Sequence, residues 1–108
     1  MECIFCIIRD RKIPKEFTYE DTDVMVFPDM HPVKPIHLLI IPKKHIEDFL
    51  AIDDEILMNK IKDVIQKMIY KEQLADKGYK IVVNGGGGQI VPHLHFHLIG
   101  PTGKKAEI

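Results

Sequence analysis

Three histidines stand at alternate positions near the end of the chain, at His93, His95 and His97, and apolar residues lie between them. This period-two alternation is typical of a half-buried β-strand, so the imidazoles share one face while the apolar side chains face the core. Same-face residues of a strand are roughly 6.5–7 Å apart, so three imidazoles would line a groove about the size of a substituted phosphate group. The pattern indicates phosphorus chemistry or a metal site.

An alternating histidine run could also be a solvated sheet edge or a weak metal-scavenging tract. Two observations favour a functional face: the run holds three of the chain's six histidines, and it follows Asn84 and four consecutive glycines at 85–88. Glycine lets backbone N–H groups approach an anion closely, so we expect Asn84 and the amides of Gly88 and Gln89 to touch a phosphate, a ribose or a leaving group. A flexible turn would also explain the glycines.

The chain has two cysteines, Cys3 and Cys6, in a C-x2-C spacing. A disulfide scaffold would need more cysteines, and a thioredoxin-like redox pair would follow a strand in a βαβ pattern. Metal binding and a pair of buried free thiols are the two interpretations left open.

Length and composition narrow the class of protein. A chain of 108 residues predicts a single domain, 1–108, because a second hydrophobic core would not fit. The net charge of −1 argues against a nucleic-acid groove filled by basic residues. No apolar run reaches the ~20 residues of a membrane span and no leader begins at Met1, so the expected location is the cytoplasm.

Hydrophobic spacing predicts the elements that position these groups. In chain order we expect a short helix over 3–11, a hairpin over 17–20 and 24–27, a shaped loop over 28–35, a central strand over 36–41, a partial helical turn over 46–50, a long helix, and strands over 79–84 and 93–99, followed by a polar tail over 102–108. The sum is an α+β fold with an antiparallel sheet of about five strands and helical cover on one face.

The long helix is predicted from an apolar stripe that recurs every three or four residues. Asp53 is its expected N-cap, and about six turns would carry it to Gly78. The stripe consists of Ile56, Leu57, Ile61, Val64, Ile65, Met68, Ile69 and Leu74, while Lys60, Lys62, Lys67 and Lys71 are expected to point outward. This pattern predicts core packing and no cofactor site.

The segment His93-Leu94-His95-Phe96-His97-Leu98-Ile99 resembles the motif after which the histidine triad (HIT) family is named. Further segments resemble the HINT branch of that family in the same order: Cys3-Ile4-Phe5-Cys6, Ile13-Pro14, Phe27-Pro28-Asp29, His37-Leu38-Leu39-Ile40-Ile41-Pro42-Lys43-Lys44-His45 and Val82-Val83-Asn84-Gly85. The resemblance covers nearly the whole chain.

The resemblance implies a two-fold dimer with joined sheets and a hydrolase that cuts purine nucleoside 5′-phosphoramidates at the P–N bond. It implies that His95 is the nucleophile, with one ring nitrogen aimed at phosphorus and the other donating to the carbonyl of His93. His97 would stabilise charge on the non-bridging oxygens, and His93 would flank the attacking ring on its other side.

The resemblance also implies a nucleotide site. Asp29 is similar to the family acid that accepts both ribose hydroxyls, and four apolar side chains would wall the base: Phe5, Ile8, Phe27 and Met30. Such walls discriminate little between purines. Any of these apolar residues could instead be core.

Four residues form a further set in the resemblance: Cys3, Cys6, His45 and His93. Two thiolates and two imidazoles make a tetrahedral zinc site, and related proteins use a similar quartet structurally. With four protein ligands, zinc would fasten the N-terminal helix to the sheet and would not activate water.

Two residues depart from the HINT pattern. Ile90 stands where these sequences carry Ser or Thr, so a hydroxyl contact is missing, and Pro92 replaces an aromatic residue. Both lie beside the reacting centre, so leaving-group preference does not transfer from the family. The alternatives are a dinucleoside polyphosphate hydrolase, an adenylyl transferase, or a nucleotide-binding or zinc-containing interaction protein.

Overall fold

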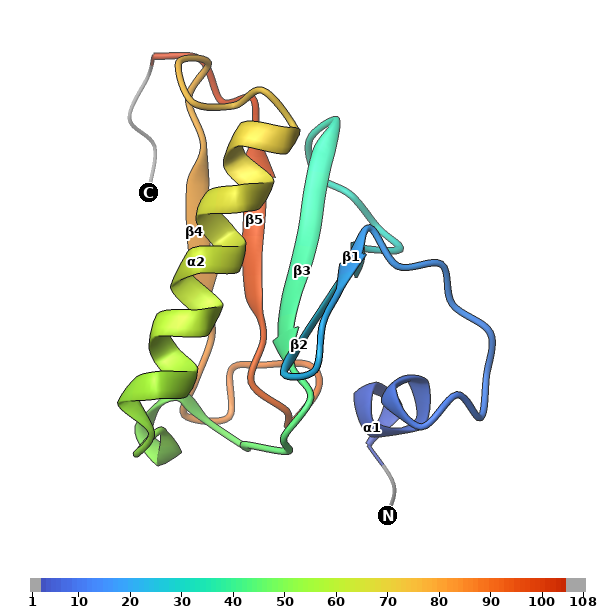
Figure 1. Cartoon of the computed structure of the whole chain (residues 1–108). Coiled ribbons are helices and arrows are strands. Elements are labelled where there is room, and N and C mark those ends of the chain that lie inside the picture. Colours follow the sequence, from blue (N-terminus) through green and yellow to red (C-terminus); the bar gives the residue numbers. More distant parts are fainter. Residues whose placement is uncertain (1–2, 105–108) are drawn as a thin grey trace.

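The computed structural model describes residues 3–104 and shows a five-stranded antiparallel sheet with a long helix packed on one face (Figure 1). The strand order is β1-β2-β3-β5-β4. In chain order the elements are α1 (Ile4–Arg9), β1 (Tyr19–Glu20), β2 (Val24–Pro28), β3 (Ile36–Pro42), a 3-10 turn (Phe49–Ala51), α2 (Glu55–Lys71), β4 (Lys80–Val83) and β5 (Phe96–Gly100). The predicted α+β fold and antiparallel sheet are confirmed.

The central strand is β3, as its apolar sequence predicts. It pairs with β2 on one side and β5 on the other, and its residues are buried from His37 onward. A continuous apolar run is typical of a strand covered on both faces. One polar side chain interrupts this run, the buried His37.

The helix α2 begins one residue later and ends earlier than predicted. Its N-cap is Asp54, whose side chain accepts the N–H of Leu57, and not Asp53. It ends at Lys71 after about five turns, because Gln73 takes a left-handed conformation with φ 58°. Leu74 is still buried, but it reaches the core from the turn that follows the helix.

The apolar stripe of α2 packs on the sheet face formed by alternate residues of β2, β3 and β5. Ile61 and Met68 lie fully inside this cluster, together with Leu94, Phe96 and Leu98. The predicted stripe is correct except at Ile56, which is 70% exposed.

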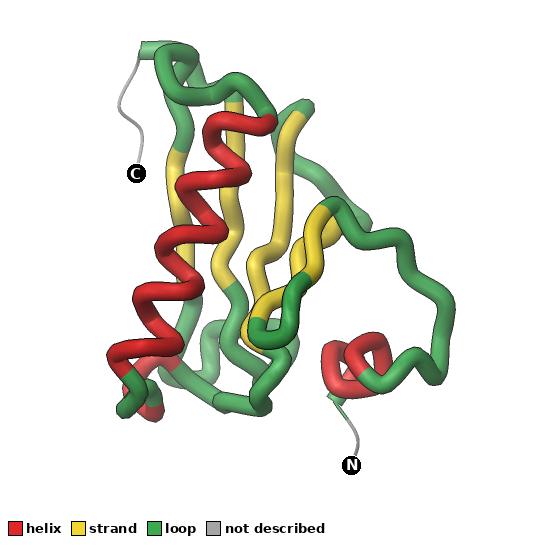
Figure 2. Tube along the Cα trace, viewed as in Figure 1, coloured by secondary structure: helices red, strands yellow, loops and turns green. Residues whose placement is uncertain are grey.

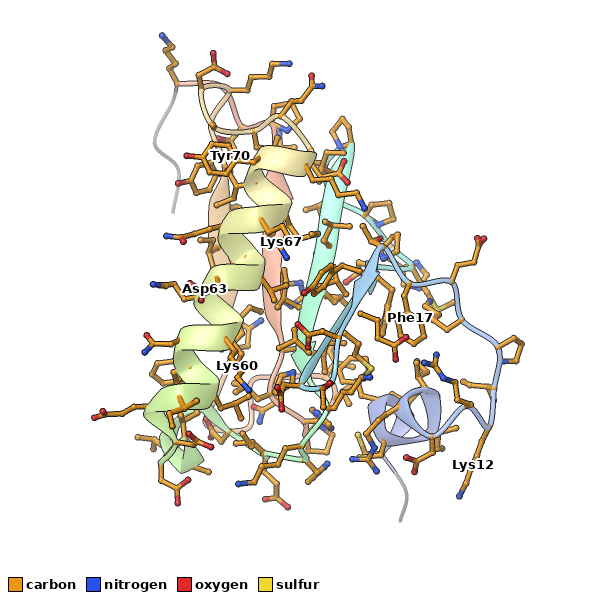
Figure 3. All side chains as sticks on the ribbon, viewed as in Figure 1. Lys12, Phe17, Lys60, Asp63, Lys67 and Tyr70 are labelled. Carbon is orange, nitrogen blue, oxygen red and sulfur yellow. The ribbon has the colours of Figure 1, made fainter. Side chains whose placement is uncertain are left out.

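The lysines of α2 are exposed, as predicted, and three of them contact the segment that holds the β1–β2 hairpin. Lys60 pairs with Asp23 at 2.7 Å, Lys67 lies over the ring of Tyr19, and Lys71 donates to the carbonyl of Thr18. Figure 3 shows Lys60 and Lys67 on the side of the helix near the β1–β2 hairpin. Through these contacts, exposed lysines of α2 hold the helix against the hairpin.

The second face of the sheet is covered as well, by α1, whereas helical cover was predicted on one face only. Phe5 and Ile8 of α1 pack on it, against Met25, Phe27, Leu39 and Ile41. The loop 10–18 returns from α1 to the first strand (Figure 2). The N-terminal helix is therefore part of the core.

The histidine strand is shorter than predicted. Its ladder begins at Phe96, so of the three triad residues only His97 lies within β5. Continuing the register would pair Leu94 with Pro42, which has no N–H to donate. The N–H of Leu94 bonds instead to the carbonyl of Ile46. The alternation of faces nevertheless persists through this irregular segment.

The chain after β5 returns to the end of the helix layer. Thr102 and Gly103 donate their N–H groups to the carbonyls of Gly78 and Lys77. This start of the predicted polar tail is thus held by backbone bonds, while 105–108 lie outside the described residues. No helix within 3–104 has the length and apolar character needed to cross a bilayer.

Candidate active site and metal centre

A cleft of about 380 Å³ opens on the sheet face that carries α1. It brings together predicted site residues from both halves of the chain. Its lining consists of Ile4, Phe5, Ile8, Lys15, Phe27, Pro28, Asp29, Met30, His31, Leu39, Asn84, Gly88, Ile90, Val91, His95 and His97. All the residues predicted to bind nucleotide are included except Gln89, whose side chain bonds to the backbone of Glu47 and Gly87.

Sheet register sets the width of the cleft. Phe27 on β2 pairs with Leu39 on β3, which pairs with His97 on β5. Two strand spacings separate Phe27 from His97, roughly 10 Å. The cleft therefore has an apolar end over β2 and an imidazole end over β5.

His95 presents an unprotonated ring nitrogen to this cleft. Its Nδ1 lies 2.8 Å from the carbonyl oxygen of His93, and because a carbonyl only accepts, Nδ1 carries the proton. The lone pair is then on Nε2. Phe5 packs edge-on against the ring at 5.2 Å between centroids and limits its rotation.

His97 presents the opposite group. The N–H of Val33 bonds to Nδ1 of His37, so the proton of His37 is on Nε2. That Nε2 lies 2.8 Å from Nδ1 of His97, which must accept, and the proton of His97 is therefore on its own Nε2. The result is an N–H donor in the cleft beside the lone pair of His95.

Burial keeps His97 in this neutral form. Desolvation lowers the pKa of His97 to about 4, and the neighbouring His95 and His37 act in the same direction. Asp29 opposes the shift, with its carboxylate 3.9 Å from Nδ1. Asp29 also lies 3.5 Å from Nε2 of His37, so Asp29 and His97, which line the cleft, form a compact group with the buried His37.

The sequence prediction missed His37. It is 7% exposed and holds the tautomer of His97, although it lies on another strand. A single imidazole inside the apolar run 36–41 was the available signal, because a buried polar group needs a partner.

His93 lies behind the cleft and does not line it. The ring is fully buried, and its Nε2 is 2.7 Å from the carbonyl oxygen of Pro42. That bond places the proton on Nε2 and aims the Nδ1 lone pair at Cys3 and Cys6. Burial lowers the pKa of His93 to about 4, so the ring is neutral.

Four donor atoms converge at this point and could hold a metal ion: Sγ of Cys3, Sγ of Cys6, Nδ1 of His45 and Nδ1 of His93. The donor atoms are separated by 3.3 Å for Cys3–His93, 3.3 Å for Cys6–His45, 3.6 Å for Cys6–His93 and 3.1 Å for His45–His93. Tetrahedral zinc with bonds of about 2.0 Å to nitrogen and 2.3 Å to sulfur gives edges close to these. The donor set therefore fits zinc in number, chemistry and spacing.

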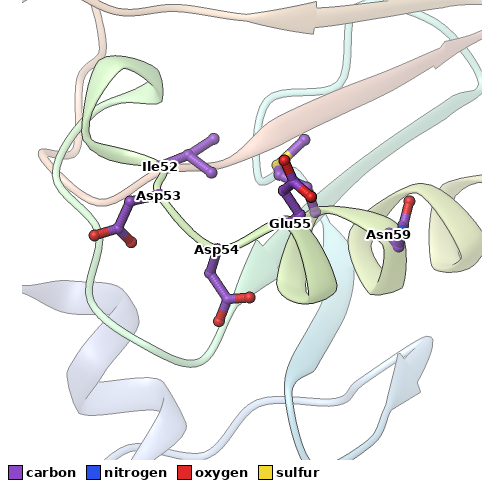
Figure 4. Close-up of a pocket in the computed structure, with 6 residues that line it drawn as sticks. Ile52, Asp53, Asp54, Glu55 and Asn59 are labelled. Atoms are coloured by element: carbon purple, nitrogen blue, oxygen red, sulfur yellow. The ribbon is translucent and has the colours of Figure 1, made fainter.

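A second hollow of about 430 Å³ lies where the chain enters α2 (Figure 4). It is lined by Ile52, Asp53, Asp54, Glu55, Met58 and Asn59. Asp54 caps the helix, and carboxylates are favourable at the positive end of a helix dipole. Helix capping accounts for these acids without a ligand.

Comparison with known proteins gives consistent matches. The family model "Scavenger mRNA decapping enzyme C-term binding" matches residues 2–107. An uncharacterized HIT-like protein of Methanocaldococcus jannaschii is 43% identical over 99 residues, 90% of this chain and 77% of that protein. The chain belongs to the histidine triad family.

Solved structures of this family have the same fold. A HIT family hydrolase from Legionella pneumophila Philadelphia 1 is 41% identical with a TM-score of 0.86, and the match covers 92% of each chain. A histidine triad nucleotide-binding protein from Candida albicans is 31% identical with a TM-score of 0.82, covering 99% of this chain and 85% of the other.

Within this histidine triad fold, the two departures lie near the imidazole end of the cleft. Ile90 is 96% exposed and lines the cleft together with Val91. The missing hydroxyl is thus replaced by an apolar side chain at the cleft mouth. Pro92 lies between this residue pair and His93 in the segment without regular pairing.

Proposed function

We propose that this protein hydrolyses purine nucleoside 5′-phosphoramidates at the α-phosphorus, through a covalent nucleotidyl-histidine intermediate. One observation carries the proposal: the lone pair of His95 and the N–H of His97 are side by side in one cleft, fixed by hydrogen bonds to their other ring nitrogens. A nucleophile beside a donor for developing negative charge is the arrangement that phosphoryl chemistry needs. Relatives named as a hydrolase and a nucleotide-binding protein support this assignment.

The reaction would take two displacements. Nε2 of His95 attacks phosphorus, the P–N bond to the amine breaks, and the amine leaves with its electron pair and takes a proton from water. The N–H of His97 stabilises the charge on a non-bridging oxygen. Water then attacks phosphorus, the bond to His95 breaks, and the nucleoside monophosphate is released.

The nucleotide itself would extend from β5 toward β2. Asn84 would lie at the phosphate end, beside Gly88, whose own N–H donates to the carbonyl of Gly85. Asp29 would lie between the ends, where ribose hydroxyls can donate to it, and Phe27 would lie at the base end. The roughly 10 Å between Phe27 and His97 matches the reach of a nucleotide from phosphorus to base.

The proposal can be tested with adenosine 5′-phosphoramidate of lysine as substrate. We expect the unmodified protein to release AMP and His95→Ala to lose at least about a thousand-fold in kcat, because the attacking atom is removed. The control is Gln66→Ala on the exposed side of α2, which should match the unmodified protein.

Equal turnover by His95→Ala would refute the nucleophile. Tight AMP binding without turnover of this substrate would favour a nucleotide-binding protein over an enzyme. Turnover of diadenosine tetraphosphate in place of the phosphoramidate would favour the polyphosphate hydrolase.

We also propose that the Cys3, Cys6, His45 and His93 cluster holds structural zinc. The donor separations and the bond from His93 to Pro42 support it. Held by these four residues, zinc would join α1 to the sheet and would leave no position for water. The chemistry of the cleft remains with His95.

A further proposal is a homodimer with joined sheets. In the described part of the chain the two edge strands are β1 and β4, and β1 has two residues while β4 has four. Ile81 on β4 is 45% exposed, and an apolar, unpaired edge of this kind favours strand addition.

A further inference from the structure

The base end of the cleft holds a cation that neither the sequence prediction nor the proposed chemistry uses. Lys15 belongs to the loop 10–18, and its Nζ lies 4.6 Å from the centroid of the Phe27 ring. Lys15 and Phe27 both line the cleft. The ammonium is therefore above the residue that marks the far end of the cleft from His97.

The position of this ammonium relative to a bound nucleotide follows from the sheet register. With phosphorus at His95 and His97, a nucleobase would lie over β2, roughly 10 Å away across two strand spacings. The ribose hydroxyls would face Asp29 between these ends. The edge of the base opposite the sugar would then meet Lys15.

The other walls at this end are apolar: Ile4, Phe5, Ile8, Phe27 and Met30. They bind any purine ring through contact area and cannot distinguish its polar edge. Lys15 is the long, donor-only side chain among them, and it is half-buried. Among the described residues, the other ionisable side chains of the cleft outside its imidazole end are Asp29, which the ribose would face, and His31. The backbone N–H of His31 bonds to the carboxylate of Asp29.

The polar edge of a purine differs between bases. Guanine and hypoxanthine present the O6 and N7 acceptors there, whereas adenine presents N7 beside an amino group that donates. An ammonium donates to O6 and repels the amino group. Adenine therefore leaves Lys15 without its better acceptor and places two donors against each other.

We infer that Lys15 makes the cleft select 6-oxopurine nucleotides, guanine and hypoxanthine, over adenine nucleotides. The inference rests on the proposed function, because it needs a nucleotide in this cleft. It adds a base preference that the apolar walls cannot provide.

Isothermal titration with AMP, IMP and GMP tests the preference directly. We expect IMP and GMP to bind about ten-fold more tightly than AMP, the usual worth of one hydrogen bond to a charged group at a half-exposed site. IMP isolates the O6 contact, because hypoxanthine lacks the 2-amino group of guanine. Phosphoramidates of AMP and GMP should show the same ratio in kcat/KM.

The variant Lys15→Met keeps the length and apolar stem of the side chain and removes its cation. It should bring the three nucleotides to within about two-fold of one another, mainly by weakening IMP and GMP. Retained binding of AMP shows that the variant is folded. Lys77→Met, which replaces an exposed lysine outside the cleft, is the matched control and should keep the ten-fold preference.

The possible failures are distinguishable. Equal binding of all three nucleotides to the unmodified protein, or a preference that survives in Lys15→Met, would overturn the role of Lys15 while leaving a nucleotide hydrolase in place. A preference that moves with His31→Ala and not with Lys15→Met would overturn it as well. Absence of binding by all three nucleotides would overturn both proposals.

Discussion

Protons on single imidazole rings decide what the cleft can do. His95 and His97 stand two residues apart, yet one presents a lone pair and the other an N–H group. The difference arises from their partners: a backbone carbonyl holds the first ring, and the chain from Val33 through His37 holds the second. The carbonyl of His93, inside the motif, fixes one ring, and His37, outside the motif, fixes the other.

The ring of His97 should also make folding depend on pH. Burial lowers its pKa from 6.5 to about 4, so between these values the unfolded chain binds a proton that the folded chain does not. The contribution of the neutral ring to the free energy of unfolding is complete above pH 6.5 and is lost as the pH falls toward 4. A shift of this size corresponds to about 3 kcal/mol. Urea unfolding at pH 7.5 and pH 5 should therefore show lower stability in acid.

The variant His97→Asn should lose part of that pH dependence, since Asn does not titrate. His31→Asn, which replaces an exposed histidine, should keep it. The pKa of His93 is lowered in the same way, and His93 belongs to the proposed zinc cluster. The unfolding measurements should therefore be made on metal-free protein with chelator present. Equal acid sensitivity of unmodified protein and His97→Asn would contradict the prediction.

The residue scale also shows why the sequence predicted the cleft only in part. Asn84, Asp29 and the triad could be found from their motifs, and the structure places Asn84, Asp29, His95 and His97 in one cleft. The positions of Lys15 in the cleft and of His37 against His97 could not be predicted, because loop 10–18 and β3 reach them through tertiary packing. A local sequence pattern does not predict which strands become neighbours in the sheet.

At the scale of elements, α1 is attached by few groups. Phe5 and Ile8 pack on the sheet, Arg9 donates to the carbonyl of Lys43 at 2.8 Å, and the cysteines face His45 and His93. A helix of six residues has little stability of its own. Its position therefore depends on this attachment, and zinc would strengthen it.

Removing zinc should release α1. We expect a strong chelator to lower the melting temperature of the purified protein by at least about 10 °C, because a metal bound only by the folded state stabilises it. Hydrogen exchange should rise at residues 4–9 before it rises in α2. Burial raises the pKa of the Cys6 thiol, so zinc binding should release protons.

The variant Cys6→Ser tests whether the chelator acts at this cluster. Its melting temperature should already be low and should not fall further in chelator. Purified protein that contains no zinc and melts at the same temperature with and without chelator would refute the structural metal.

The helix α2 offers a sharp comparison of two isoleucines. Ile61 is 1% exposed in the core, while Ile56, which the apolar stripe placed in the core, is 70% exposed. Ile61→Ala should cost about 2–5 kcal/mol in the free energy of unfolding, and Ile56→Ala should stay within about 0.5 kcal/mol. Urea denaturation measures both. Similar losses would show that Ile56 is covered in solution.

The helix also shows why boundaries are harder to predict than elements. Its period of three to four residues identified the buried face correctly, because burial follows spacing. The stop signal at Gly78 was misplaced, since the chain leaves the helix at Gln73 and buries Leu74 from a turn. Hydrophobic spacing alone does not show whether Leu74 is buried from the helix itself or from the turn that follows it.

At the scale of the whole molecule, the sheet has a core on each face. Residues that alternate along β2 and β3 belong to different clusters: Val26 and Ile40 face α2, while Phe27 and Leu39 face α1. The strand patterns predicted the sheet because β2, β3 and β5 are strongly apolar. The second layer escaped prediction because α1 is too short for its periodicity to indicate a face.

Joined sheets would place β4 of two copies side by side. The edge of β4 is open among the described strands, and Ile81 is partly exposed there. A charged side chain on an edge strand is a natural block to strand addition. We therefore expect the unmodified protein to be a dimer and Ile81→Lys to be a monomer by light scattering at micromolar concentration. Far-ultraviolet circular dichroism should confirm that the variant is folded.

Ile56→Lys is the matched control, because it adds the same charge at an exposed isoleucine elsewhere. Ile56 shares a hollow with Thr22 and Lys44 on the β2 side of the sheet, away from β4. It should therefore remain a dimer. An unmodified protein that is monomeric would refute the dimer. A dimer that persists in Ile81→Lys and dissociates in Ile56→Lys would place the contact on the opposite side of the molecule, because only the location of the charge differs between the two variants.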